Sequence, residues 1–160
     1  MTTLVVWTFP DVAAAGRAER LLVPVSARQD MAVHDGAVLT WPASARRPRT
    51  RGLHSIALDD AVGGDFWAVL FAVVFLLPIL PGPDDAPNDA GVSVLAGVGI
   101  PDAFTAELRR VAGPGTSALA VLTGTPLPAA ETALAALRPR RTSTVFSAAG
   151  LRTLRDVFAG

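Results

Sequence analysis

The hydrophobic positions of this chain gather in one unbroken run, Phe66 to Leu80. Its fifteen residues carry no charge, and the only polar side-chain atom is the indole nitrogen of Trp67. As an α-helix the run would rise about 22 Å, which is short of the ~30 Å hydrocarbon core of a bilayer. It is nevertheless apolar on every side, whereas a surface helix is apolar along one stripe. Its length favours a helix over a buried strand, and Pro78 is expected to kink or end that helix.

Small residues within this run and a second apolar arm after it indicate that the run packs closely against another helix. Gly64, Ala68 and Ala72 recur every four residues, a spacing that lets two helix backbones approach closely. The loop-forming stretch 81–90 comes next, rich in proline and aspartate, and a shorter glycine-rich arm covers 91–100. Together they predict an apolar hairpin, inserted at 57–99, that dips into a membrane or is buried between subunits.

The rest of the chain alternates between strand-like and helix-like patterns. Five segments rich in β-branched and apolar residues, or with alternating side chains, are predicted strands: Thr3–Phe9, Gly36–Trp41, Arg47–Leu53, Ser117–Thr123 and Thr142–Phe146. Four segments have helical spacing: Val12–Val23, which Pro24 should close, Pro101–Val111, Leu127–Leu137 and Leu151–Phe158.

This order predicts one α+β domain over 1–160. The first part matches the split βαβ pattern called ferredoxin-like, here with an inserted apolar helical hairpin and a C-terminal α-β-α extension. In the first helix, we expect Ala14, Ala18, Leu21 and Leu22 to face the sheet. Because the helices of such a sheet lie on one face, the other must be covered by a second subunit or by the hairpin.

Arginines dominate the third predicted strand. Arg47, Arg49 and Arg51 share one face of an extended chain, and Arg46 adds a charge beside them. One interpretation is an edge strand that charge protects from pairing with other chains. The other is a contact for an anionic headgroup, a phosphate or an acidic partner.

Composition narrows the function classes. Fourteen basic and fourteen acidic residues give no net charge, and no aromatic residues interleave with the arginines, so nucleic-acid binding is not expected. Without cysteine there are no disulfides and no thiolate metal site. The N-terminal residues lack the pattern of a signal peptide, which predicts the cytoplasm or the cytoplasmic face of the inner membrane.

We find no pattern that specifies catalysis. His34 and His54 form no metal-binding spacing, and residues 113–117 lack the lysine and following helix of a phosphate-binding loop. The aspartates at 84, 85 and 89 lack the spacing of a calcium loop. The sequence therefore predicts no catalytic residue, no metal and no cofactor.

Several segments together resemble one family. FWAVLFAVVFLLPILPG is similar to FWGLLFGLLFFVPLLG of the bacterial family called domain of unknown function 1269, and VGIPDAFTAELRRVAGPGTSALAVLT is similar to its VGIDDDFI…PGTSALFLL segment. WPASARRPRTRGLH and LRTLRDVF resemble further segments of that family, in the same order. Members are described as uncharacterised membrane proteins, so the resemblance implies a membrane but no activity. Here Ala68 and Ala72 stand where the family has glycines, and the stretch PDDAPNDAGVSVLAG, with three aspartates, replaces the family's glycine-rich second arm.

Our leading hypothesis is a non-enzymatic protein that self-associates through segment 66–80, either on a membrane or as a soluble multimer. Its partners would be copies of itself and membrane lipid. The expected contact residues are Gly64, Phe66, Trp67, Ala68, Phe71, Ala72, Phe75 and Leu76. The alternative is a small-ligand or anion-sensing regulatory module that uses Arg46, Arg47, Arg49 and Arg51.

Overall fold

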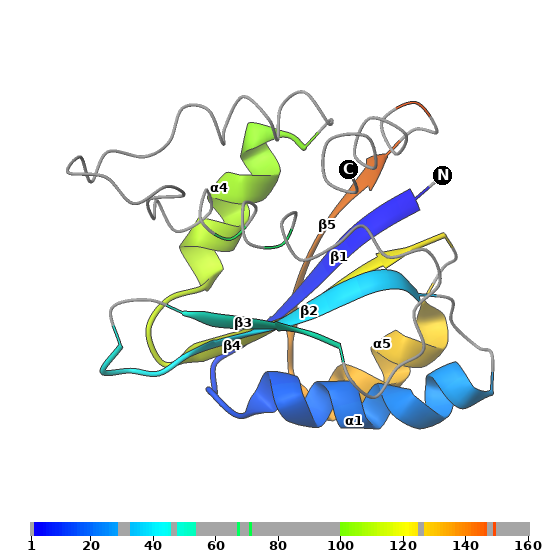
Figure 1. Cartoon of the computed structure of the whole chain (residues 1–160), viewed down its shortest axis with the longest axis horizontal. Coiled ribbons are helices and arrows are strands. Elements are labelled where there is room, and N and C mark those ends of the chain that lie inside the picture. The colour runs from blue at the N-terminus through cyan, green and yellow to red at the C-terminus, as the bar shows by residue number, and fades with distance from the viewer. Residues whose placement is uncertain are drawn as a thin grey trace.

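The computed structural model describes residues 2–28, 33–45, 48–53, 67, 71, 100–124, 127–146 and 149. These residues form an α+β fold built on a five-stranded antiparallel sheet (Figure 1). The strands are β1 (Thr2–Phe9), β2 (Val33–Trp41), β3 (Arg49–Gly52), β4 (Thr116–Thr123) and β5 (Arg140–Phe146). The helices are α1 (Ala14–Ala27), α4 (Asp102–Val111) and α5 (Pro128–Leu134), which continues as the 3-10 turn η1 (Ala135–Leu137).

The strand order is β3-β2-β4-β1-β5, and each neighbouring pair is antiparallel. β4 therefore lies between β1 and β2, the two strands that α1 connects. β1 lies in the same way between β4 and β5, which α5 connects. β3 is a four-residue edge strand beside β2, as the edge-strand interpretation of its arginines predicted.

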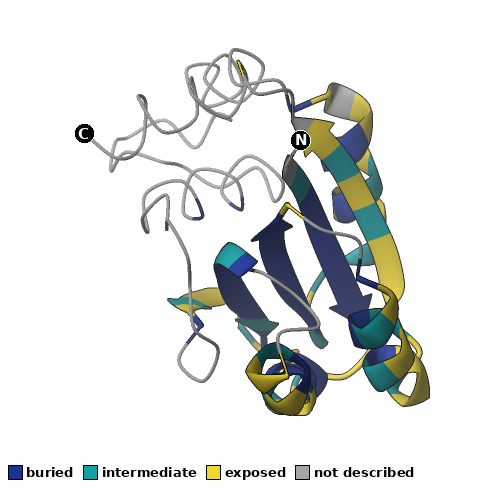
Figure 2. Cartoon of the chain, turned by 90° about the vertical axis from the view of Figure 1, so that its right-hand side faces the viewer, coloured by how far each residue is buried: buried dark blue, intermediate teal, exposed yellow. Residues whose placement is uncertain are grey.

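Alternating side chains on the central strands give the sheet two buried faces. On β1, Val5 and Trp7 point towards α1 and α5, whereas Leu4 and Val6 point towards α4. Figure 1 shows α1 and α5 on one side of the sheet and α4 on the other. Figure 2 shows the buried central strands beside an edge strand whose residues are exposed or half-buried. Both faces are therefore core.

The second face receives cover from within the same chain. Phe104 and Leu108 of α4 pack there, and Trp67 and Phe71, from within segment 57–99, join the same cluster. Ile100, just before α4, is also part of it. We expected this face to be covered by the inserted hairpin or by a second subunit. Among the described residues, its cover comes from this chain itself.

Helix α1 differs from its prediction in two ways. It continues past Pro24 to Ala27. Pro24 has no N–H to donate to the Arg20 carbonyl, but Arg20 is exposed, so this carbonyl can bond to water. Val25, which follows the proline, packs into the core. Leu21 was expected to face the sheet, but it is 41% exposed, and Glu19 is buried instead. The predictions for the rest of 57–99 and for a helix at 151–158 lie outside the described residues.

Candidate functional site

The described arginines of β3 point to the same side of the sheet. Arg49 pairs with Thr40 on β2, and Arg51 pairs with Val38. Val38 belongs to the core that α1 covers, so both arginines lie on the α1 face. The alternation predicted from the sequence is therefore present. Arg46 and Arg47 lie outside the described residues.

A hollow of about 330 Å³ lies where these two strands meet. Its lining consists of Val38, Thr40, Arg49, Thr50 and Arg51. Val38 is buried and forms apolar wall, Thr40 is half-buried, and Arg49 and Thr50 are exposed. Two hydroxyls and two guanidinium groups thus line an open, partly apolar space beside an edge strand.

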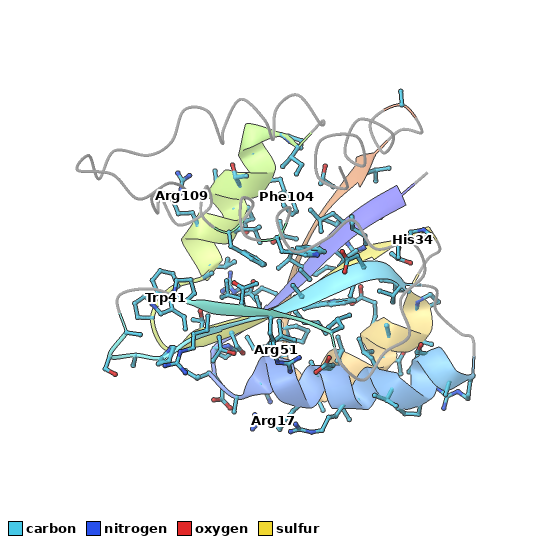
Figure 3. All side chains as sticks on the ribbon, viewed as in Figure 1. Arg17, His34, Trp41, Arg51, Phe104 and Arg109 are labelled. Atoms are coloured by element: carbon cyan, nitrogen blue, oxygen red, sulfur yellow. The ribbon has the colours of Figure 1, made fainter. Side chains whose placement is uncertain are left out.

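The guanidinium of Arg51 is held by a buried carboxylate. Its Nη2 atom donates to Oε1 of Glu19 at 2.8 Å, and Figure 3 shows Arg51 directed from β3 towards α1. The side chain of Glu19 is 4% exposed, against 39% for that of Arg51. A buried carboxylate without a partner is costly, so Arg51 compensates Glu19 and is itself fixed in place.

The charge of Arg49 has no such compensation. No ion pair or hydrogen bond of its side chain occurs within the part of the chain that the structure describes. The hollow therefore contains one neutralised and one available cation. The sequence did not predict Glu19 as part of this site, although its position four residues after Ala15 and three before Leu22 places it on the buried side of α1.

The first turn of α1 lies close to this end of the sheet. Thr40 pairs with Ser117 of β4, whose hydroxyl accepts a hydrogen bond from the Ala15 N–H at 3.0 Å. The same hydroxyl donates to the Asp11 carbonyl at 2.6 Å. The Asp11 carboxylate also accepts a hydrogen bond from the Ala13 N–H at 3.1 Å, so a negative charge already lies at the positive end of the α1 dipole.

Two of the eight residues predicted to contact a membrane or another subunit are described. Trp67 and Phe71 are 3% and 4% exposed, and their rings stack with centroids 6.3 Å apart. They lie in the core of this chain rather than on a free surface. Gly64, Phe66, Ala68, Ala72, Phe75 and Leu76 lie outside the described residues, so the contact predicted for them stays a prediction.

The ion pairs with altered pKa values do not line the hollow. The Ala13 N–H, followed by the Arg17 guanidinium, lowers the pKa of Asp11 below its ordinary value. Arg110 lowers the pKa of Glu107 on α4, and Glu107 in turn raises the pKa of Arg110. These groups are exposed and paired, and they form no acid–base site.

Within the described ranges, no group of three histidine, aspartate or glutamate side chains is arranged to hold a metal ion. Nor does any described helix have both the length and the apolar character needed to cross a bilayer. The described site is thus a basic hollow at a sheet edge, in an α+β protein whose sheet is covered on both faces.

Residues 61–158 match the family model described as "Protein of unknown function (DUF1269)", and because the match covers more than half of the chain, this chain belongs to that family. The resemblance noted in the sequence is confirmed. Neither the curated proteins nor the solved structures yield a match. The family description carries no activity, so function must be argued from the site.

Proposed function

We propose that this protein is a non-enzymatic regulatory module that binds a small anion in the hollow between β2 and β3. The observation that carries the proposal is the uncompensated Arg49 beside Thr40, next to an Arg51 that is already fixed by Glu19. One cation is free to meet a ligand, and the second is rigid. A charged hydrogen bond to a positioned guanidinium is stronger than one between neutral groups.

The arrangement of the site suits reversible binding. The hollow is open at a sheet edge and lacks the paired acid, base or nucleophile that catalysis needs among the residues described. An exposed ion pair contributes ~1 kcal/mol at most and is weakened by salt. Binding should therefore be modest, fast and dependent on ionic strength, as suits a sensor of ligand concentration.

A ferredoxin-like classification is part of the proposal. The order β2-β4-β1-β5, with two crossover helices on one face, supports a split βαβ sheet to which β3 adds an edge strand. With this classification, the hollow forms between the regular sheet and its added strand. Loss of β3 would remove the site and leave the four-stranded sheet.

The test is a titration of the full chain with sodium acetate, a small anion with one charge, followed by NMR of arginine side chains and backbone amides. We expect shifts confined to Arg49, Thr40 and their neighbours, weakened by added salt. Arg49→Ala should abolish saturable binding. Arg140→Ala is the matched control, because Arg140 is an exposed arginine on the opposite edge strand. Unsaturable shifts spread over all arginines, or equal losses in both variants, would refute the proposal.

A second candidate function is self-association through segment 66–80, on the cytoplasmic face of a membrane or as a soluble multimer. The burial of Trp67 and Phe71 favours it, because two residues four apart use only one side of a helix. By sequence, the same spacing would place Val69, Val73 and Leu76 on the opposite side. That side is apolar and would need a partner.

Val73→Asp tests this candidate by native mass analysis of the full chain. We expect the oligomer to dissociate, while Val145→Asp, at a valine of β5 that is 49% exposed, should leave its size unchanged. A carbonate wash of cell membranes then separates the two forms: a resistant pellet indicates lipid contact, and a soluble particle indicates a multimer. An unchanged mass for Val73→Asp argues against self-association through this segment.

A further inference from the structure

We infer that the hollow selects a small organic acid with a single negative charge, a carboxylate with a short apolar chain, over multiply charged anions such as phosphate. This inference rests on the proposed anion-binding function and names its ligand class. Three features of the site carry it: the net charge of the hollow, the geometry of its cations and its apolar wall.

The charge around the hollow matches one negative charge. Arg49 and Arg51 bring two positive charges, and one of them, that of Arg51, is ion-paired with the buried carboxylate of Glu19 at 2.8 Å. A singly charged ligand can therefore be neutralised by Arg49. Arg49 and Arg51 are the two cations of the lining, so the second charge of a phosphate dianion would be desolvated there without a further cation to pair with, which opposes its binding.

The shape of the cations also favours a carboxylate. A guanidinium is planar and presents paired N–H donors, which match the two oxygens of a carboxylate. Thr40 supplies a hydroxyl within the same lining, and a hydroxyl can donate to a further lone pair. The head of the ligand would thus lie against Arg49 and Thr40.

The wall and the volume of the hollow limit the chain that the carboxylate can carry. Val38, which is only 2% exposed, lines the hollow and belongs to the apolar core beneath it. Because Val38 itself is buried, the apolar surface open to a ligand comes mostly from the methyl and methylene groups of the other lining side chains, Thr40, Arg49, Thr50 and Arg51. A short hydrocarbon chain would cover this surface, whereas an inorganic anion would leave it in contact with water. A volume of about 330 Å³ lies at the lower end for ligand sites, so the chain must be short.

Glu19 sets this preference without lining the hollow. It lies on α1 and acts through its ion pair with Arg51, so it is a positioning residue. Glu19→Gln keeps the length of the side chain and an oxygen that can accept from Arg51, but it removes the negative charge. The variant should therefore gain affinity for phosphate and change little towards a carboxylate. A purely structural role would weaken both ligands alike.

The experiment compares sodium butyrate with inorganic phosphate at pH 8 and constant ionic strength, by NMR titration of the full chain. We expect butyrate to bind the wild type about fivefold more tightly, the effect of about one half-exposed ion pair. Glu19→Gln should remove or reverse that ratio, and Glu19→Asp, which retains the charge, should preserve its direction. Arg49→Ala should abolish binding of both probes.

The outcomes separate this inference from the function on which it rests. Phosphate binding the wild type as tightly as butyrate overturns the preference for organic acids and leaves anion binding intact. Failure of both probes and of acetate to bind overturns both proposals. Because the wild-type ratio alone decides the preference, a variant of Glu19 that fails to fold does not remove the test.

Discussion

Both faces of the sheet are buried, but they are covered by different means. One face is covered by α1 and α5, the helices that connect strands of the sheet in sequence. The other is covered by α4 together with Trp67 and Phe71, two residues from within segment 57–99. The first cover results from the order of strands and helices, whereas the second depends on a segment that the sheet itself does not require.

The two faces of the sheet also differ in their hydrogen bonds. On the α1 face, Trp7 donates its indole N–H to Glu131 of α5, and Ser117 bridges β4 to the start of α1. On the α4 face Trp41 donates its indole N–H to the Ala45 carbonyl, and the buried hydroxyl of Thr8 has no hydrogen-bond partner among the described residues. Hydrogen bonds to α1 and α5 therefore help to fix the position of the first layer.

The largest effect is expected from removing one tryptophan on each face. Trp67→Ala and Trp7→Ala should each lower the free energy of unfolding by about 3–5 kcal/mol, because both side chains are buried. Chemical denaturation measures this loss, and Trp67→Phe is a milder substitution should Trp67→Ala not fold. For both residues the loss should be the same at all protein concentrations.

Protein concentration provides the control for this pair. A destabilisation by Trp67→Ala that disappears on dilution, while that of Trp7→Ala persists, would place Trp67 in an interface between copies instead of in the core of one chain. The second face of the sheet would then be covered by another subunit and not by this chain alone.

A smaller effect is expected where a hydrogen bond fixes the first layer. Ser117→Ala removes the acceptor of the Ala15 N–H and the donor to the Asp11 carbonyl, at a fully buried position. The expected loss is about 1–3 kcal/mol in the free energy of unfolding. Ser143→Ala on exposed β5 is the control and should change stability little. Equal stability of both variants would show that Ser117 does not secure α1.

The smallest effects concern two exposed carboxylates, one on each side. The pKa values of Asp11 and Glu107 are lowered in the folded protein. Their contributions to stability are therefore present above the unfolded-state pKa and are lost as the pH falls through the folded-state pKa, below about pH 4. Titration followed by carboxyl carbon NMR should give both midpoints below their ordinary values.

Removing the arginine partner of each carboxylate sharpens this test. Arg110→Ala should return Glu107 close to its ordinary pKa, because the Arg110 side chain is the main cause of the shift. Arg17→Ala should return Asp11 only part of the way, because the Ala13 N–H contributes more. Full recovery of Asp11 in Arg17→Ala would contradict this ranking.

The strands could be predicted from the sequence because alternating apolar and polar side chains, and a high content of β-branched residues, are typical of buried strands. Ser117–Thr123 was predicted and Thr116–Thr123 is observed. The start of β2 at Val33 was missed, since His34 and Asp35 are polar and the register shifts between Val33 and Asp35. Asp35 is nevertheless buried, with its Oδ1 accepting the Gly36 N–H. A bulge of this kind depends on the neighbouring strand, which local sequence does not reveal.

The candidate site could be predicted in part. Alternation placed Arg49 and Arg51 on one face, but sequence spacing could not tell that α1 lies against that face or that Glu19 meets Arg51 across 32 positions of the chain. Contacts between distant segments depend on the tertiary arrangement. The charge balance of the hollow, on which its ligand preference depends, was therefore not available from the sequence.

The residues that flank segment 54–99 have a consequence for how this family can vary. Leu53 packs into the core on the α1 face, close enough to Gly36 that a Cβ there would lie 2.5 Å from Cδ1 of Leu53, whereas Ile100 packs into the core on the α4 face. The two residues that flank the stretch thus contribute to opposite faces of the sheet. Lengthening the stretch costs little entropy, since that cost grows only with the logarithm of length. Its deletion would instead remove Trp67 and Phe71 from the core of the α4 face, so insertions here should be tolerated far better than deletions.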